Sequence, residues 1–339
     1  MTLTQTALLT KKIMLFSAIA LVISISGWLG YRYYYYNIYL PNLPKVEVKP
    51  EVKFGTLAKP LLPQNSFSPT NFSYVLDTPT GDLPNDLPKL MKVYFVPERS
   101  IGLMDSNRAT DLALKLGFSL GPEIISPTKF RYSDSSGGQM IIDLNTGNFK
   151  FQKNVASDSA SLQVGKLSST TQIEQNFKQF LSNKGLIRKQ LEGGVVKAFY
   201  NQGSQITSSN ATVSIWQTDI DGFPIVSPTF NAGIIKSIVT SGQTDADRYL
   251  SLDYFYWQVE QTVLSTYPIR SVSQAFSDLK SGQGVVIMAP DNPKVSIRSV
   301  YLAYFLPDLY AQYLQPVYVF NGENFVAFVP AISPNLLEH

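Results

Sequence analysis

The length, composition and charge of the chain exclude several classes of function. The chain has 339 residues, of which 44% are hydrophobic and 16% are charged, so it can bury a core and is not disordered as a whole. It contains no cysteine, and its single histidine is the last residue, His339. The lack of cysteine and of an internal histidine excludes a cysteine nucleophile, a disulfide, a thiolate or histidine metal site and an internal Ser-His-Asp triad. The net charge is +3 without any basic run, which argues against nucleic-acid binding.

An uncharged apolar stretch near the N-terminus predicts a membrane anchor. Residues 13–30 read IMLFSAIALVISISGWLG, and a helix of that length spans roughly 27 Å, close to the hydrocarbon core of a bilayer. Two lysines precede the stretch and one arginine follows it, so the positive-inside rule places the N-terminus in the cytoplasm. We therefore expect a cytoplasmic tail at 1–12, one transmembrane helix at 13–31 and an extracytoplasmic body. The residues expected to flank the membrane are Lys11, Lys12, Trp28, Tyr31 and Arg32.

Two other interpretations of this stretch remain open. A cleaved signal peptide has a shorter apolar region and a site with small residues, whereas bulky tyrosines follow Gly30 here. A buried helix of a soluble protein is the second alternative. The lipid bilayer is the partner that the anchor itself predicts.

A proline-rich segment follows the anchor. Residues 37–70 hold six prolines and little periodicity, a composition typical of an extended, semi-rigid spacer. We therefore predict a spacer over residues 32–70 that holds a folded body away from the membrane.

The remaining chain predicts an α+β fold of repeated units, each with one amphipathic helix followed by antiparallel strands. Three helices are expected, at 107–117, at 169–185 with a start that resembles a capping box, and at 271–282. Two hairpin signals lie at 144–147 and 321–324. The strands are predicted at 129–133, 139–143, 148–152, 195–201, 211–218, 223–227, 232–240, 284–288, 295–304, 316–321 and 325–329. We expect three units, at 71–165, 166–265 and 266–333.

The C-terminal part of the chain resembles the YycH/YycI-type regulatory proteins, which are similar to PepSY-like modules. The resemblance is best over residues 221–332, where a helix is followed by strands and a hairpin. The positions that carry it are Ala275, Leu279, Gly282, Tyr304 and Pro316, together with the turn at 221–225. It implies PepSY/YycI-like units, a non-enzymatic role and contact with a membrane sensor histidine kinase of a two-component system.

Motifs that would carry chemistry are weak in this sequence. Asp219-x-Asp221-Gly222 begins like a calcium loop, but Phe223 and Pro224 occupy positions that need a ligand and a glycine, so a hairpin turn is expected. Ser277-x-x-Lys280 has the spacing of Ser-Lys enzymes, but Ser126-x-x-Lys129 matches as well and no Lys-Thr-Gly accompanies them. We expect no catalytic, cofactor-binding or metal-binding residue, and no cofactor.

Aromatic clusters provide the candidate contact residues. Tyrosines and a tryptophan gather at 249–257 and again at 301–313, and exposed aromatic side chains are good interface anchors. Packing between helix and sheet is the alternative. Within the second cluster we expect Phe305, Tyr310 and Tyr313 to be exposed and to form an interface.

The function predicted from the sequence is modulation of an envelope sensor, such as a histidine kinase, by protein–protein contact. A PepSY-like module that binds or inhibits a peptidase, or binds the cell wall, is the first alternative. A glycan hydrolase that uses two carboxylates is the second.

Overall fold

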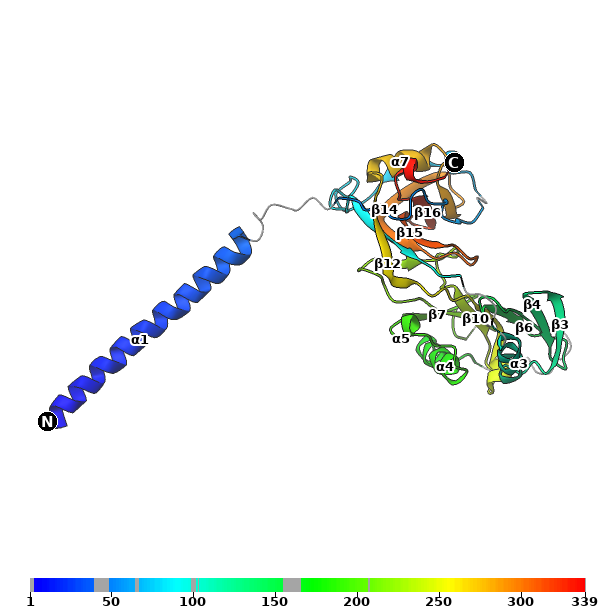
Figure 1. Ribbon diagram of the computed structural model, residues 1–339, viewed down its shortest axis with the longest axis horizontal. Helices are drawn as coiled ribbons and strands as arrows, with labels where there is room; N and C mark the ends of the chain where they lie inside the picture. The colour runs from blue at the N-terminus through cyan, green and yellow to red at the C-terminus, as the bar shows by residue number, and fades with distance from the viewer. Residues whose placement is uncertain are drawn as a thin grey trace. The chain divides into compact units, whose positions relative to one another are not determined.

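The structure is a computed structural model, and it describes residues 3–39, 49–64, 67–98, 102, 104–154, 166–206 and 208–338, with side chains from residue 14 onward. The chain divides into two units, Met1–Lys49 and Pro50–His339. The first unit consists of helix α1 (Leu3–Tyr34), which continues into a π-helical turn, η1 (Tyr35–Tyr39) (Figure 1).

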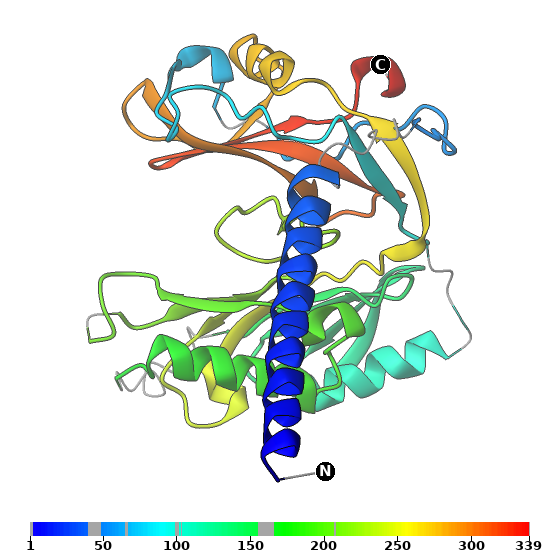
Figure 2. The same ribbon diagram turned by 90° about the vertical axis from the view of Figure 1, so that its left-hand side faces the viewer.

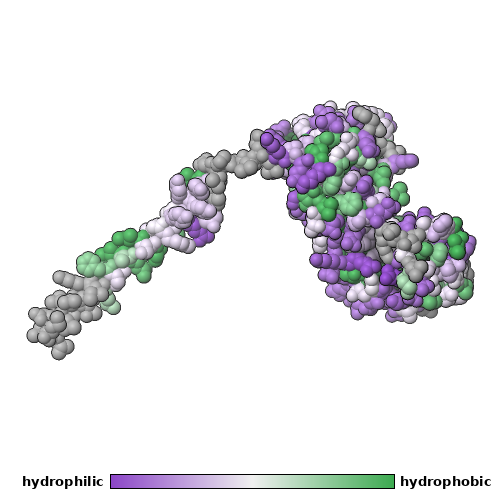
Figure 3. Space-filling view, in the orientation of Figure 1, coloured by the Kyte–Doolittle hydropathy of each residue, from purple (hydrophilic) through white to green (hydrophobic). Residues whose placement is uncertain are grey.

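Helix α1 confirms the predicted apolar helix. Among the described residues it is the one helix that is long and apolar enough to cross a membrane, with the apolar span Met14–Tyr39. Figure 3 shows an apolar band along the middle of the helix and a more polar end after it. The side chains from Met14 to Tyr34 are exposed on every side of the helix.

The second unit contains two eight-stranded sheets, which we call the mixed sheet and the antiparallel sheet. The mixed sheet has the order β1-β14-β15-β16-β13, with β2 joining β15 to β12 and with β9 beside β14. Its parallel pairs are β1 with β14 and β9 with β14. Its strands are β1 (Ser73–Leu76), β2 (Leu90–Phe95), β9 (Ile225–Val226), β12 (Glu260–Pro268), β13 (Val285–Met288), β14 (Lys294–Phe305), β15 (Tyr313–Gly322) and β16 (Phe325–Pro330).

The antiparallel sheet has the order β3-β4-β5-β6-β11-β10-β8-β7. Its strands are β3 (Leu120–Ser126), β4 (Lys129–Ser133), β5 (Gln139–Asp143), β6 (Phe149–Gln152), β7 (Val196–Tyr200), β8 (Ala211–Ile215), β10 (Ile235–Val239) and β11 (Tyr249–Tyr254). The helices of this unit are η2 (Pro69–Asn71), α3 (Asp105–Lys115), α4 (Thr170–Asn183), α5 (Lys189–Glu192), α6 (Asp245–Arg248), α7 (Val272–Lys280) and η3 (Pro334–Leu336).

The three predicted amphipathic helices are confirmed as α3, α4 and α7. Ser169 caps α4 and Ser271 caps α7, because each hydroxyl accepts a hydrogen bond from the backbone amide three residues later. The start of α4 was expected to resemble a capping box, in which Glu174 would bind the backbone at the N-terminus of the helix. The structure does not show this arrangement. The carboxylate of Glu174 instead accepts the backbone amide of Ala198, at 3.0 Å, from the edge strand β7.

Each sheet builds a core with the helices on one of its faces. Helices α3 and α4 pack their apolar stripes onto the antiparallel sheet, and α7 packs onto the mixed sheet. Figure 2 shows the two sheets with their inner faces turned toward each other and with these helices on the outer faces. The inner face of the mixed sheet is also buried, where Val226 of β9 and Phe230 of the loop after it pack against the side chains of this face.

The predicted spacer over residues 32–70 is wrong at both ends, because residues 32–39 continue the helix as the end of α1 and as η1, and residues from 50 onward belong to the folded unit. The amide of Leu57 donates to the carbonyl of Leu336 at 2.9 Å, and its carbonyl accepts from Glu338 at 2.8 Å. Gln315 donates to the carbonyl of Ala58 at 2.8 Å, and Leu57 is fully buried. Prolines restrict the backbone without preventing an extended segment from packing against a sheet. Residues 40–48, 65 and 66 of that spacer lie outside the described residues.

The sheets also do not follow the predicted division into units at 71–165, 166–265 and 266–333. Strand β2 pairs with β12 and β15, whereas α3 and β3 to β8 belong to the other sheet. The described chain therefore crosses between the sheets four times, before α3, on each side of β9 and before β12. Strand pairing at long sequence separation decided this arrangement, and local patterns do not encode it.

Candidate functional site

The segment between β11 and β12, residues 255–259, is held on one side by a side chain of α5 and on the other by the backbone of the loop after β14. Gln190 of α5 donates to the carbonyl of Val259 at 2.8 Å and accepts from the Tyr256 hydroxyl at 3.2 Å. On the other side, the indole of Trp257 donates to the carbonyl of Pro307 at 2.7 Å. This crossing is therefore an ordered connection between the two sheets.

The turn before β9 forms a second ordered crossing. Asp221 and Gly222 both adopt positive φ, and Ile220 and Phe223 pair across them, so the predicted hairpin turn is confirmed. The carboxylate of Asp221 accepts a hydrogen bond from the Tyr94 hydroxyl and pairs with Lys92 at 3.1 Å. Burial alone would raise the pKa of Asp221, but these two partners outweigh it and lower the pKa overall.

A cavity of about 1340 Å³ opens where the crossing segments meet the ends of the sheets. Its walls come from residues 256–262, from Arg188 to Gln190, from the β5–β6 turn, from Arg108 of α3 and from Pro97, Glu98 and Tyr310. We call it the intersheet cavity. Elements from both sheets build it, so a ligand there would touch both halves of the body.

One wall of the intersheet cavity is aromatic. Tyr256, Trp257 and Tyr310 line it, and the rings of Trp257 and Tyr310 meet edge to face with centroids 5.8 Å apart. The Tyr310 hydroxyl donates to the carbonyl of Val96 at 2.9 Å. Since the two hydroxyls and the indole N–H already donate to protein groups, this wall offers a ligand mainly ring carbon and no free donor.

The cations of the cavity lie beside this wall. Arg188 and Lys189 are exposed, and among the described residues neither forms an ion pair. Burial raises the pKa of the Tyr256 hydroxyl, and the nearby charge of Arg188 offsets part of that rise. Arg108 differs, because it pairs with Asp105 at 3.4 Å.

Two of the three carboxylates that line the cavity are used by their own turns. Asp143 accepts hydrogen bonds from the amides of Asn145 and Thr146, at 2.9 and 3.1 Å. Glu260 accepts from the hydroxyl and the amide of Thr262, at 2.7 and 3.2 Å. These bonds lower the pKa of Glu260, which favours the ionised form rather than a general acid. The arrangement suits binding and gives no support to the glycan-hydrolase alternative.

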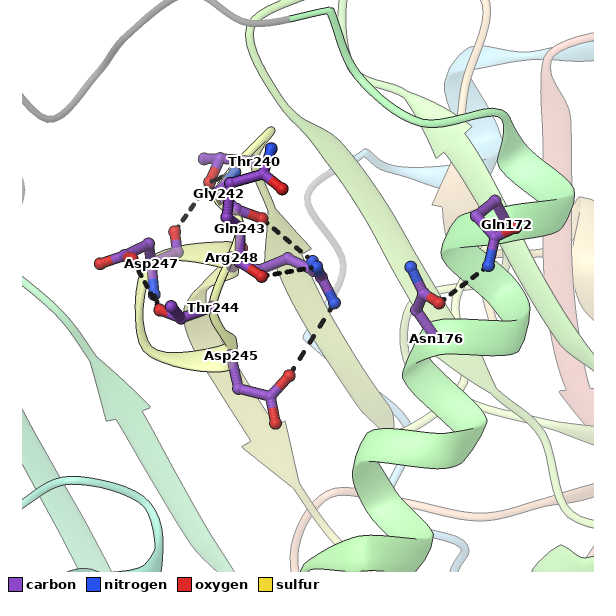
Figure 4. Close-up of polar contacts among 9 residues, drawn as sticks. All are labelled: Gln172, Asn176, Thr240, Gly242, Gln243, Thr244, Asp245, Asp247 and Arg248. Atoms are coloured by element: carbon purple, nitrogen blue, oxygen red, sulfur yellow. Dashed lines mark hydrogen bonds and ion pairs between the residues drawn. The ribbon is translucent and has the colours of Figure 1, made fainter.

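A second, smaller cavity of about 90 Å³ lies beside the loop between β10 and β11. Figure 4 shows Arg248 folded back on this loop, where it donates to the carbonyls of Gly242 and Gln243 at 3.2 and 3.1 Å. A side chain at Gly242 would collide with the backbone of Asp247 and Arg248. These contacts hold the loop together, and the cavity has room for little more than water.

The predicted membrane-flanking residues all belong to α1. The guanidinium of Arg32 lies over the rings of Trp28 and Tyr36, at 5.4 and 5.9 Å from their centroids. The Tyr31 ring stacks on that of Tyr35 at 5.9 Å. Lys11 and Lys12 lie in the same helix, but their side chains lie outside the described residues.

The predicted interface of Phe305, Tyr310 and Tyr313 is not a single exposed patch. Phe305 is 1% exposed and packs in the inner-face core of the mixed sheet, so the expectation that it is exposed is wrong. Strand β14 extends one residue further than expected and carries Phe305 inward. Tyr313 is half-buried and stacks on Phe54 at 4.9 Å. Only Tyr310 lines the intersheet cavity.

The residues that carry the family resemblance occupy packing and turn positions. Ala275 and Leu279 are buried on α7, Tyr304 and Pro316 are buried in paired positions of β14 and β15, and Gly282 ends α7 with positive φ. They lie around one sheet and do not form a site. No family model matches the chain, and no curated protein matches it in sequence. The resemblance therefore rests on this residue pattern alone.

The sequence identified part of the intersheet cavity and missed the rest. Tyr256 and Trp257 belong to an aromatic cluster that was singled out, although Tyr249 and Tyr254 of that cluster are core residues. Arg188, Lys189 and Gln190 were missed, because nothing near them in the sequence indicates that residues 256–259 lie beside them. The local signal was limited to two adjacent cations shortly before the glycine pair Gly193-Gly194.

Proposed function

We propose that the chain is a single-pass, membrane-anchored binding protein without catalytic activity. Its N-terminus is cytoplasmic and its body is extracytoplasmic, where it modulates an envelope protein by contact. The single observation that carries the proposal is the exposed, apolar helix α1, which is long enough to cross a membrane, in a chain whose second unit contains an open cavity of about 1340 Å³. Two lysines before the apolar span and one arginine after it support the orientation.

A membrane sensor such as a histidine kinase is the proposed partner. The support is the residue pattern of the mixed sheet, which resembles that of the YycH/YycI-type proteins. This resemblance implies contact with such kinases. We also propose that the repeated units of the body are related to PepSY/YycI-like modules. The burial of Ala275, Leu279, Tyr304 and Pro316 is compatible with it, because packing positions are the ones that relatives would share.

The absence of cysteine allows a direct test of the orientation. Single-cysteine variants Thr4→Cys and Ser135→Cys place one thiol in the N-terminal segment and one in an exposed turn of the body. A membrane-impermeant maleimide applied to intact cells is expected to label Ser135→Cys only, and to label both after lysis. Labelling of Thr4→Cys alone in intact cells, or recovery of the chain from the cytosol, would refute the proposal.

A photo-crosslinking amino acid tests the contact surface. Gln258 is exposed and lines the intersheet cavity, whereas Gln283 is exposed after α7 on the outer side of the mixed sheet. Crosslinking from position 258 is expected to capture a membrane protein that position 283 does not capture. Equal capture from both positions, or none from position 258, would contradict a contact role for the cavity.

A further inference from the structure

The size of the intersheet cavity indicates the kind of ligand it takes. Sites for small molecules usually measure about 300–1,000 Å³, and this cavity measures about 1340 Å³. It is also open along residues 256–262, where Gln258, Gln261 and Thr262 are exposed. A segment of a polymer fits such an open space better than a compact metabolite does.

The aromatic wall selects for an apolar group on that ligand. Tyr256, Trp257 and Tyr310 present ring carbon, because their hydroxyl and indole donors are already bound to protein groups. Trp257 is only 8% exposed and held from behind by Pro307, so the wall is preorganised. Rigid aromatic surfaces of this kind anchor apolar side chains of a partner.

The cations select for negative charge next to that apolar group. Arg188 and Lys189 are exposed and have no ion-pair partner among the described residues. The wall also carries the carboxylates of Glu98, Asp143 and Glu260. Those of Asp143 and Glu260 accept hydrogen bonds within their own turns, but neutral donors do not cancel a carboxylate's charge. The preference for acid is therefore local to Arg188 and Lys189 and does not extend over the whole cavity.

We infer that the intersheet cavity binds an extended acidic peptide segment of a partner protein, with an apolar side chain against Trp257 and carboxylates against Arg188 and Lys189. This inference rests on the binding part of the proposed function and names its ligand class. Strand β12 supports a peptide, because Gln261 to Val263 bulge out of its pairing with β2 at the cavity rim. A bulge re-aims side chains and leaves backbone available to an extended chain.

The test uses the full chain in lipid nanodiscs and three fluorescein-labelled peptides, EDFEDL, KRFKRL and EDAEDA. EDFEDL is expected to bind at least about tenfold more tightly than KRFKRL, since a hydrogen bond to a charged group contributes that much. It is expected to exceed EDAEDA by about tenfold as well, because burial of a Phe or Leu side chain contributes a similar amount. The double variant Arg188→Ala/Lys189→Ala is expected to lose this advantage. The matched control Lys280→Ala/Lys294→Ala removes two exposed lysines from the mixed sheet and is expected to bind EDFEDL as the wild type does.

A second readout locates the binding. In a Trp28→Phe/Trp216→Phe background Trp257 is the single tryptophan, and EDFEDL is expected to change its fluorescence. Equal binding of the basic peptide, no loss in the Arg188→Ala/Lys189→Ala variant, or an unchanged Trp257 signal would each overturn the inference. Tighter binding of an acidic oligosaccharide such as oligogalacturonate would overturn the peptide assignment.

The outcomes separate this inference from the proposed function. If no peptide binds while position 258 still crosslinks a membrane protein, the ligand class is wrong and the proposed function stands. If EDFEDL binds but the body proves to be cytoplasmic, the orientation is wrong and the peptide site stands.

Discussion

Removing the carboxylate of Asp278 tests how burial controls the strength of an ion pair between α7 and the segment that precedes it. Arg270 and Asp278 approach to 2.5 Å, and their side chains are 6% and 7% exposed. Gln274 also donates to Asp278, at 2.9 Å, and Arg270 donates to the carbonyl of Ile332 at 3.0 Å. Asp278→Ala leaves the guanidinium buried with only the carbonyl partner. Loss of one partner of a buried pair costs about 3–5 kcal/mol, a large part of the stability of a typical domain.

The matched control is an ion pair of the same length on the surface. Arg298 and Glu323 also approach to 2.5 Å, but their side chains are 56% and 66% exposed. Glu323→Ala is therefore expected to cost no more than about 1 kcal/mol. Replacing both buried partners, as Arg270→Met/Asp278→Leu, is expected to recover most of the loss in Asp278→Ala, because no uncompensated charge remains.

Urea unfolding of the full chain in detergent measures these differences. Trp257 belongs to the core of the mixed sheet, so its fluorescence in the Trp28→Phe/Trp216→Phe background reports this sheet. Equal costs for Asp278→Ala and Glu323→Ala would refute the reasoning from burial. A double variant as unstable as Asp278→Ala would refute the assignment of the loss to the unpaired arginine.

Three further predictions concern the crossings and the N-terminal edge of the body. Gln190→Ala removes the side chain that binds segment 255–259, so amide exchange in that segment is expected to speed up about tenfold while α4 stays unchanged. Leu57→Ala opens a cavity at a fully buried position and is expected to cost about 2–5 kcal/mol in urea unfolding. A cost near zero would show that residues 50–62 do not contribute to the core. Burial would raise the pKa of Asp221, but the Tyr94 hydroxyl and a lysine lower it overall. The ionised form therefore adds stability above the unfolded pKa of about 3.9, and this is lost as pH falls through the folded value. The difference in free energy of unfolding between the wild type and Asp221→Asn should therefore shrink between pH 6 and pH 3. A difference that stays constant over this range would contradict a lowered pKa of Asp221.

Elements with strong local signals were predicted correctly from the sequence. Helices α4 and α7 have serine caps, apolar stripes and terminal glycines, and strands β4 and β5 match their predicted bounds. Strand β3 was missed because its Gly121-Pro122 pair is typical of a turn. Strand β12 was missed because its first half is polar and exposed, so it lacks the alternation that marks a strand.

The sequence by itself determined the apolar N-terminal helix, the α+β class, the three amphipathic helices and the lack of thiol and internal imidazole groups. These follow from composition and from periodicities of two and 3.6 residues, which act within short stretches of chain. The tertiary structure decided which strands share a sheet, that residues 50–62 pack into the body and that Phe305 points inward. It also brought Arg188 and Lys189 beside Tyr256 and Trp257. Pairing of distant strands and the burial that accompanies it fix these features, and neither is encoded by neighbouring residues alone.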